Sequence, residues 1–310
     1  PRCGALVHAR ALATLAAQAD VATAALHLAD ATRAWHQALQ LLPPDAAQVP
    51  VIEARLAELG ARMERGEGRA APARGPGSRR GLWGTLLAGL AFLAAKGKLL
   101  LLALTKIGTL LPLLASLGIY WQLWGWAIGA GVLVSLYLHE LGHMAALWRY
   151  GIPVSAPMFL PGFGAYVRHG HLPTARLGAR VALAGPAAGL GAALAAAGVY
   201  AVTREPYWAV LAKFGAWLNL LNLAPVWILD GAKVFDPLSR AERWVVVMAL
   251  LLAGVAGRDA VVSLIGIVAA LVTFLRPAAG DGDRGACLLT VATVLGLGAL
   301  LVLLPGAALP

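Results

Sequence analysis

Residues 125–148 read GWAIGAGVLVSLYLHELGHMAALW, an apolar run whose single acidic side chain is Glu140. About 20 consecutive apolar residues suffice for a helix to cross the hydrocarbon core of a bilayer. An ionisable group inside such a helix is costly, so its presence indicates a function. Here the acid lies beside His139 and His143, which a helix places on one face. The run therefore predicts a membrane helix that carries a reactive site.

The motif His139-Glu140-Leu141-Gly142-His143 is typical of a zinc site. Two histidines one turn apart can share one Zn²⁺, and the glutamate between them can take a proton from a water. A pair of merely buried histidines would leave the glutamate unexplained. Catalytic zinc commonly has three protein ligands, so a third must come from elsewhere in the chain.

Asp230 is the candidate third ligand, because it is the other acid at the edge of a long apolar run. Two alternatives stay open for this part of the chain. Asp230 could instead pair with Lys233 at a helix end, and His169 or His171 could compete as ligands.

The composition favours a polytopic membrane protein. Of 310 residues, 60% are hydrophobic and 13% are charged, about half the charged share of soluble domains. This excludes a disordered chain and a coiled coil, and it argues against a soluble enzyme. The net charge is +10, but the basic residues form no cluster, so we expect no nucleic-acid partner. Cys3 and Cys287 are too few and too far apart for a disulfide framework.

The chain divides into two parts joined by a linker. Residues 1–65 predict a small soluble domain of about three helices, broken at Pro43-Pro44-Asp45 and weakly similar to a tetratricopeptide unit. Cys3 is either a free thiol or part of a metal knuckle completed outside this chain. Residues 66–80 are rich in Gly, Pro and Arg, as in a flexible linker, and residues 81–310 form the membrane part.

The membrane part predicts about six transmembrane helices. Three lysines interrupt the first runs, and two later runs are short enough to form a tight hairpin. The apolar runs are 82–103, 107–120, 125–148, 179–202, 207–229, 243–256, 260–275 and 286–304. Residues 152–170 differ, because their Pro, Gly and β-forming residues predict an extended hairpin turned at Pro161–Gly164. The fold class is thus an all-α polytopic membrane protein with one β-hairpin and a small helical domain.

The charges predict one common side for the reactive residues. Basic residues follow the motif helix, the hairpin and Asp230: Arg149, Arg168, Arg176, Arg180, Lys233, Arg240 and Arg243. The opposite loops are nearly neutral, so the positive-inside rule puts the site toward the cytoplasm. Arg79-Arg80 favours a cytoplasmic N-terminal domain as well. We expect a multi-pass protein of the cell membrane, and the Ala, Gly and Arg bias suggests a bacterium.

These motifs resemble the site-2 proteases, a family of intramembrane zinc metalloproteases. The resemblance covers about residues 120–240 and includes Gly185-Pro186, the segment Asn222–Pro225 and Leu229-Asp230-Gly231. The prolines that usually precede Leu-Asp-Gly in the family are replaced here by Trp227 and Ile228.

The resemblance implies that His139, His143 and Asp230 hold Zn²⁺ and that Glu140 is the catalytic base. It implies further that Phe159–Val167 is a membrane-reentrant hairpin. The substrate would be a transmembrane protein embedded in the lipid bilayer, cut in or near its membrane segment. Residues expected to contact the substrate are Asn222, Pro225, Gly162 and Gly164.

Other functions stay open. A membrane-bound zinc protease could cut soluble or unfolded chains, and a zinc-binding membrane protein or transporter would cut nothing. A transporter commonly shows repeated halves, which this sequence lacks. Residues 1–65 could bind a regulatory protein.

Overall fold

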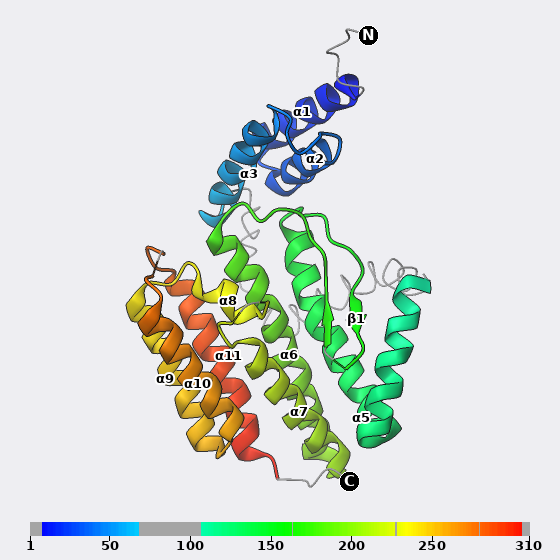
Figure 1. The fold of residues 1–310 in the computed structure, drawn as a ribbon, viewed down its shortest axis with the longest axis vertical. Coiled ribbons are helices and arrows are strands. Elements are labelled where there is room, and N and C mark those ends of the chain that lie inside the picture. The colour runs from blue at the N-terminus through cyan, green and yellow to red at the C-terminus, as the bar shows by residue number, and fades with distance from the viewer. Residues whose placement is uncertain (1–7, 68–106, 163, 227, 279, 306–310) are drawn as a thin grey trace, which may run out of the picture.

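The computed structural model describes residues 8–67 and 107–305, except residues 163, 227 and 279. The described chain is mostly helical and has one small two-stranded sheet (Figure 1). Several sequence predictions lie outside the described residues: Cys3, most of the linker, the apolar run 82–103 and Trp227.

Three helices make up the N-terminal part: α1 (Ala9–Ala24), α2 (Leu28–Gln40) and α3 (Val49–Glu64). The expected break at Pro43-Pro44 lies between α2 and α3, because proline cannot supply the N–H that a continuing helix needs. Leu28 of α2 and Ile52 and Leu56 of α3 are buried, and Leu12 and Leu15 of α1 pack against the cluster that contains the two α3 residues.

Helix α5 (Ile107–Arg149) consists of two arms that meet at Gly125. Gly125 has φ 78° and ψ 159°, a conformation outside the helical region that glycine tolerates. At Gly129 a Cβ atom would lie 2.8 Å from the backbone of Tyr120 and Trp121, so the arms approach closely beside the turn. The predicted runs 107–120 and 125–148 thus become two adjacent helical arms (Figure 1).

A β-hairpin follows α5, as expected for residues 152–170. Strand β1 (Met158–Leu160) pairs antiparallel with β2 (Gly164–Tyr166), and a bridge between Val154 and His169 extends the pairing. The turn has positive φ at Gly162 (81°) and Gly164 (118°), which favours glycine at both positions. The hairpin packs on α5, where the ring of Phe159 stacks on Tyr137.

The remaining helices form a bundle beside α5 (Figure 1). They are α6 (Ala175–Thr203), α7 (Pro206–Asn222), α8 (Asp230–Phe235), α9 (Arg240–Gly257), α10 (Ala260–Leu275) and α11 (Arg284–Leu303). Helix α7 ends at Asn222, before the end of the apolar run 207–229. The reason is Pro225, because a proline disfavours helical backbone at the residue that precedes it. Asp230 therefore begins a new short helix rather than ending a long one.

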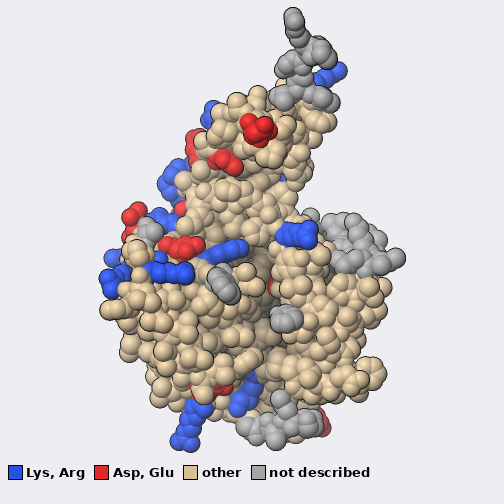
Figure 2. All heavy atoms as spheres, viewed as in Figure 1, with Lys and Arg blue, Asp and Glu red and all other residues tan. Residues whose placement is uncertain are grey.

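Within residues 8–67 and 107–305, three helices are long and apolar enough to cross a membrane: Leu110–Arg149, Ala175–Thr203 and Arg284–Leu303. Helix α10 is apolar but has only 16 residues. Figure 2 shows few charged side chains around the middle of the bundle, with Lys and Arg gathered toward its ends. This distribution suits a body surrounded by lipid.

The N-terminal helices sit on the loops that surround the start of α6 (Figure 1). Thr174, the N-cap of α6, donates a hydrogen bond to Glu64 at the end of α3. Gly60 faces Pro173, and the backbone of Gly151 at the end of α5 lies directly against the Ala29 carbonyl. The N-terminal part therefore contacts the segments that connect the motif helix to α6.

Candidate metal centre

Three donor atoms from α5 and α8 converge at one point. The Nε2 atoms of His139 and His143 lie 3.0 Å apart. The Oδ2 atom of Asp230 lies 3.1 Å from the first and 3.3 Å from the second. Both histidines are buried. The fold thus brings Asp230 to His139 and His143, which precede it by 91 and 87 positions in the sequence.

The spacing of these atoms fits zinc. Ligand atoms around a tetrahedral Zn²⁺ with bonds of 2.0–2.1 Å lie about 3.3 Å from one another. Two imidazole nitrogens and one carboxylate oxygen are also a common donor set for catalytic zinc. A Zn²⁺ held by His139, His143 and Asp230 would keep one further position for water or substrate. Asp230 does not pair with Lys233, because the Asp230 carboxylate contacts the two histidines instead.

The outer nitrogen of each histidine is held so that Nε2 faces the centre. The Nδ1 atom of His143 lies 2.8 Å from the carbonyl of Val181, which can only accept, so Nδ1 donates. The Nδ1 atom of His139 lies 2.7 Å from Oδ1 of Asn219. Asn219 in turn donates from Nδ2 to the Gly215 carbonyl at 2.7 Å, which assigns its oxygen to His139. Both Nε2 atoms therefore keep a free lone pair for a metal.

Sequence reasoning missed Asn219. It selected Asn222, one turn later, from the family motif. A signal was present, because an amide in the middle of an apolar helix needs a hydrogen-bond partner. The sequence alone does not identify that partner.

Two glycines of α6 leave room for the site. A Cβ atom at Gly185 would clash with the imidazole of His143 and would lie 2.8 Å from Nε2 of His139. A Cβ atom at Gly189 would clash with the amide of Asn219. Small residues four positions apart in a membrane helix commonly serve only to let helices pack closely. The structure instead puts one glycine against the donor histidines and the other against the residue that orients them.

Glu140 is the remaining member of the cluster. It is 5% exposed, and its carboxylate and the two histidines offer donor atoms that all lie within 4.8 Å of one another. A buried carboxylate at this distance can exchange a proton with a water at the centre. Among the described residues, His139, Glu140 and His143 are thus close enough to share a metal, and Asp230 adds a second carboxylate beside the two histidines.

A cavity of about 150 Å³ opens onto the centre. Its walls come from α5, the hairpin, α6, the end of α7 and α8, and they include Tyr166, Val167, His169, Asn222, Ile228 and Lys233. Burial lowers the pKa of His169, although its hydrogen bond to the Gly170 carbonyl opposes this effect. Of the predicted substrate residues, only Asn222 lines this cavity.

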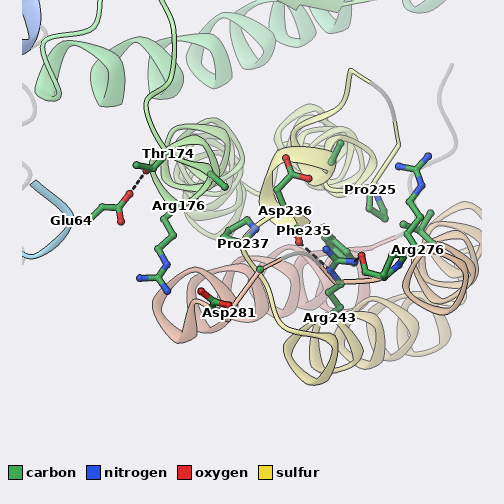
Figure 3. Close-up of a pocket in the computed structure, with 15 residues that line it drawn as sticks. Glu64, Thr174, Arg176, Pro225, Phe235, Asp236, Pro237, Arg243, Arg276 and Asp281 are labelled. Carbon is green, nitrogen blue, oxygen red and sulfur yellow. Dashed lines mark hydrogen bonds between the residues drawn. The ribbon is translucent and has the colours of Figure 1, made fainter. Parts of the chain in front are cut away.

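Pro225 lines a different cavity, of about 660 Å³, between α6, α8 and α9 (Figure 3). Arg176, Asp236 and Arg243 line it as well, and the Thr174–Glu64 hydrogen bond lies at its edge. Gly162 and Gly164 lie in the hairpin turn, where a Cβ atom at either position would meet nothing closer than 3.9 Å. His171 lies at the base of the hairpin rather than at the metal centre.

Comparison with known proteins supports the same chemistry. "Putative zinc metalloprotease Rip2" of Mycobacterium tuberculosis is 33% identical over 149 residues, covering 36% of this chain and 57% of the relative. "Putative zinc metalloprotease Rip3" of the same organism is 35% identical over 155 residues, covering 45% of this chain and 37% of the relative. The chain therefore spans about half the length of the curated relatives it matches.

The chain matches no protein-family model and no solved structure. The similarity to these two relatives and the His-Glu-x-x-His helix support the resemblance of this chain to the site-2 protease family of zinc metalloproteases.

Proposed function

We propose that this protein is a zinc-dependent endopeptidase that hydrolyses a peptide bond in or near a transmembrane segment of a membrane-protein substrate. The observation that carries the proposal is the triangle of donor atoms from His139, His143 and Asp230, with Glu140 buried beside it in an apolar helix. The names of the two relatives support the zinc-protease part. The membrane substrate is an extension that rests on the apolar setting of the site.

The chemistry follows from the residues. His139, His143 and Asp230 would hold the metal, which, when bound, polarises a water and the scissile carbonyl. Glu140 accepts a proton from the attacking water as its oxygen bonds to the carbonyl carbon. Glu140 then delivers that proton to the departing nitrogen as the C–N bond breaks. The products are a carboxylic acid and an amine, and the carboxylate of Glu140 is restored.

The hairpin would present the substrate. A transmembrane helix hides its carbonyls in its own hydrogen bonds, so the scissile segment must unwind before it is cut. Tyr166 and Val167 line the cavity and belong to or follow β2. An unwound segment could pair with this hairpin by strand addition, with Phe159–Val167 dipping into the membrane. Asn222 would contact its backbone at the cavity, and Pro225, Gly162 and Gly164 would shape the approach.

The arrangement in the membrane extends the same proposal. The chain would cross the membrane about six times, through α5, α6, α7, α9, α10 and α11. The metal centre and residues 1–65 would face the cytoplasm of a bacterial cell, with residues 66–80 as a linker to the protease part 81–310. Residues 1–65 would then be the soluble part that receives a regulatory protein.

The test uses the full chain in detergent and in liposomes. Zinc is measured by elemental analysis on wild type, Asp230→Ala and Glu140→Gln, with Asp236→Ala as the matched acidic control outside the metal centre. Cleavage is measured on a panel of tagged single-span segments, with and without a helix-weakening Gly-Pro pair, and on fluorescein-labelled casein.

We expect about one zinc per chain in wild type, Glu140→Gln and Asp236→Ala, and its loss in Asp230→Ala. Wild type and Asp236→Ala should cut the segments that carry Gly-Pro, and the other two variants should cut none. Zinc that is absent, or unchanged in Asp230→Ala, would overturn the ligand set. Cleavage of casein alone would indicate a protease for soluble chains, and zinc without any cleavage would indicate a non-proteolytic protein.

A further inference from the structure

A lysine and a histidine meet at the edge of the metal-centre cavity. Lys233 lies on α8, three residues after Asp230, and His169 lies on the return leg of the hairpin. The Nζ atom of Lys233 is 3.4 Å from Nε2 of His169, and both residues line the cavity with Glu140. The contact therefore joins two elements across the opening of the cavity.

His169 is arranged to hold the lysine. Its Nδ1 lies 2.7 Å from the Gly170 carbonyl, which can only accept, so Nδ1 carries the proton. Its Nε2 then has a lone pair and accepts from the Lys233 ammonium. A neutral imidazole does not cancel the charge of the lysine, whose side chain is exposed at the edge of the cavity.

That charge has no acidic partner in the described chain. No carboxylate of residues 8–67 or 107–305 forms an ion pair with Lys233 within 4.0 Å, and Asp230 pairs with the two histidines. Among the described residues that line the cavity, Lys233 is the one Lys or Arg, whereas Glu140 and Asp230 are both acids.

We propose that Lys233 stabilises the negative charge that develops on the scissile carbonyl oxygen, and that His169 positions its ammonium for this role. The inference rests on the proposed peptidase function. Attack by water turns the carbonyl oxygen into an oxyanion at this cavity, beside the metal that His139, His143 and Asp230 would hold. A fixed cation at the cavity favours the transition state more than the uncharged substrate, and loss of one such donor typically lowers the rate about 10²–10³-fold.

The test separates transition-state binding from substrate binding. The probe is the panel segment that wild type cleaves, resynthesised with a phosphinate in place of the scissile amide. The phosphinate is tetrahedral and anionic, as the oxyanion is. The unmodified segment is bound to the same variants in a Glu140→Gln background, where it stays intact. The variants are Lys233→Met, Lys233→Arg and His169→Gln, with Lys213→Met as the control that removes a lysine of α7 outside the cavity.

We expect Lys233→Met to retain zinc, to bind the phosphinate about 100-fold more weakly and to bind the unmodified segment as wild type does. In the cleavage assay kcat should fall while KM stays unchanged. Lys233→Arg should recover most of the phosphinate affinity, His169→Gln should lose part of it, and Lys213→Met should match wild type.

Three outcomes would overturn the inference. Equal loss of both probes in Lys233→Met would make Lys233 a general substrate contact. Loss of zinc in Lys233→Met would show that Lys233 supports the position of Asp230. Unchanged phosphinate affinity in that variant would show that Lys233 has no role in the reaction. A wild-type protein that binds no zinc or cuts no segment would instead overturn the proposed peptidase function, before the variants are compared.

Discussion

The Nδ1 atom of His139 lies 2.7 Å from the Oδ1 atom of Asn219, a residue 80 positions further along the chain. Both side chains are almost fully buried, and the amide nitrogen of Asn219 is committed to the Gly215 carbonyl. The contact therefore sets both the rotation of the His139 ring and the position of its proton. A hydrogen bond of this kind, outside the ligands themselves, commonly changes metal affinity 10–100-fold.

Replacing Asn219 with alanine should weaken zinc binding about 10–100-fold, because His139 loses the acceptor that fixes its Nδ1 proton. The measurement is competition for zinc with a chelator of known affinity. Asn222→Ala is the matched control, since the amide of Asn222 donates to the Leu218 carbonyl at 3.3 Å and not to a donor histidine. Equal zinc affinities in the two variants would show that Asn219 does not orient the site.

Gly185→Ala should abolish or strongly reduce zinc binding. The added methyl group would occupy the space of the His143 ring and crowd Nε2 of His139. Gly191→Ala lies six residues later in the same helix, where a Cβ atom meets nothing within 4 Å. This control should retain zinc and be neutral or slightly stabilising, because alanine favours helix over glycine by about 1 kcal/mol. Zinc content at the wild-type level in Gly185→Ala would contradict the close packing of α6 on the histidines.

Local patterns predicted much of the site. The motif from His139 to His143 needs only helical spacing to put two imidazoles together. Asp230 could be selected because acids are scarce in the apolar runs, and the structure brings it to both histidines. The hairpin of residues 158–166 followed from its prolines and glycines, which exclude a long helix.

The rest depends on contacts between distant segments. Asn219 and Asn222 are both asparagines near the end of one apolar run, so the sequence does not distinguish them. The packing of α7 on α5 makes Asn219 the partner of His139. Pro225 follows the motif, yet the loop after α7 turns it toward another cavity. The docking of the N-terminal helices depends on backbone approaches at Gly151 and Gly170, which leave no periodic signal in the sequence.

The contact of α2 with the base of the hairpin should weaken in mild acid. Burial, together with a smaller effect of the nearby His171, lowers the pKa of His36 to about 4. The unfolded chain takes up this proton near pH 6.5, so the stabilisation is present above pH 6.5 and is lost as the pH falls toward 4. Between pH 7.5 and pH 5.0 the loss should be roughly 2 kcal/mol.

Hydrogen exchange of the α2 amides, corrected for the intrinsic effect of pH, measures this loss. His36→Gln should remove most of the pH dependence over that range. His27→Gln, at an exposed histidine next to α2, should leave it as in wild type. The same pH dependence in both variants would assign it to other groups.

Gly151→Ala should release the N-terminal helices from the membrane part. Gly151 has φ 72°, and its backbone lies against the Ala29 carbonyl, so an added methyl group would both strain the turn and push α2 away. Limited proteolysis should then remove residues 1–65 faster from this variant than from wild type, while zinc content stays unchanged because the donor residues lie in α5 and α8.

Gly66→Ala is the matched control: Gly66 also has positive φ (82°), but a Cβ atom there meets nothing within 4 Å. It shares the backbone strain without the clash, so it should be cut near the wild-type rate. Equal acceleration in the two variants would attribute the effect to strain, and no acceleration in Gly151→Ala would show that the contact with Ala29 does not hold the N-terminal part in place.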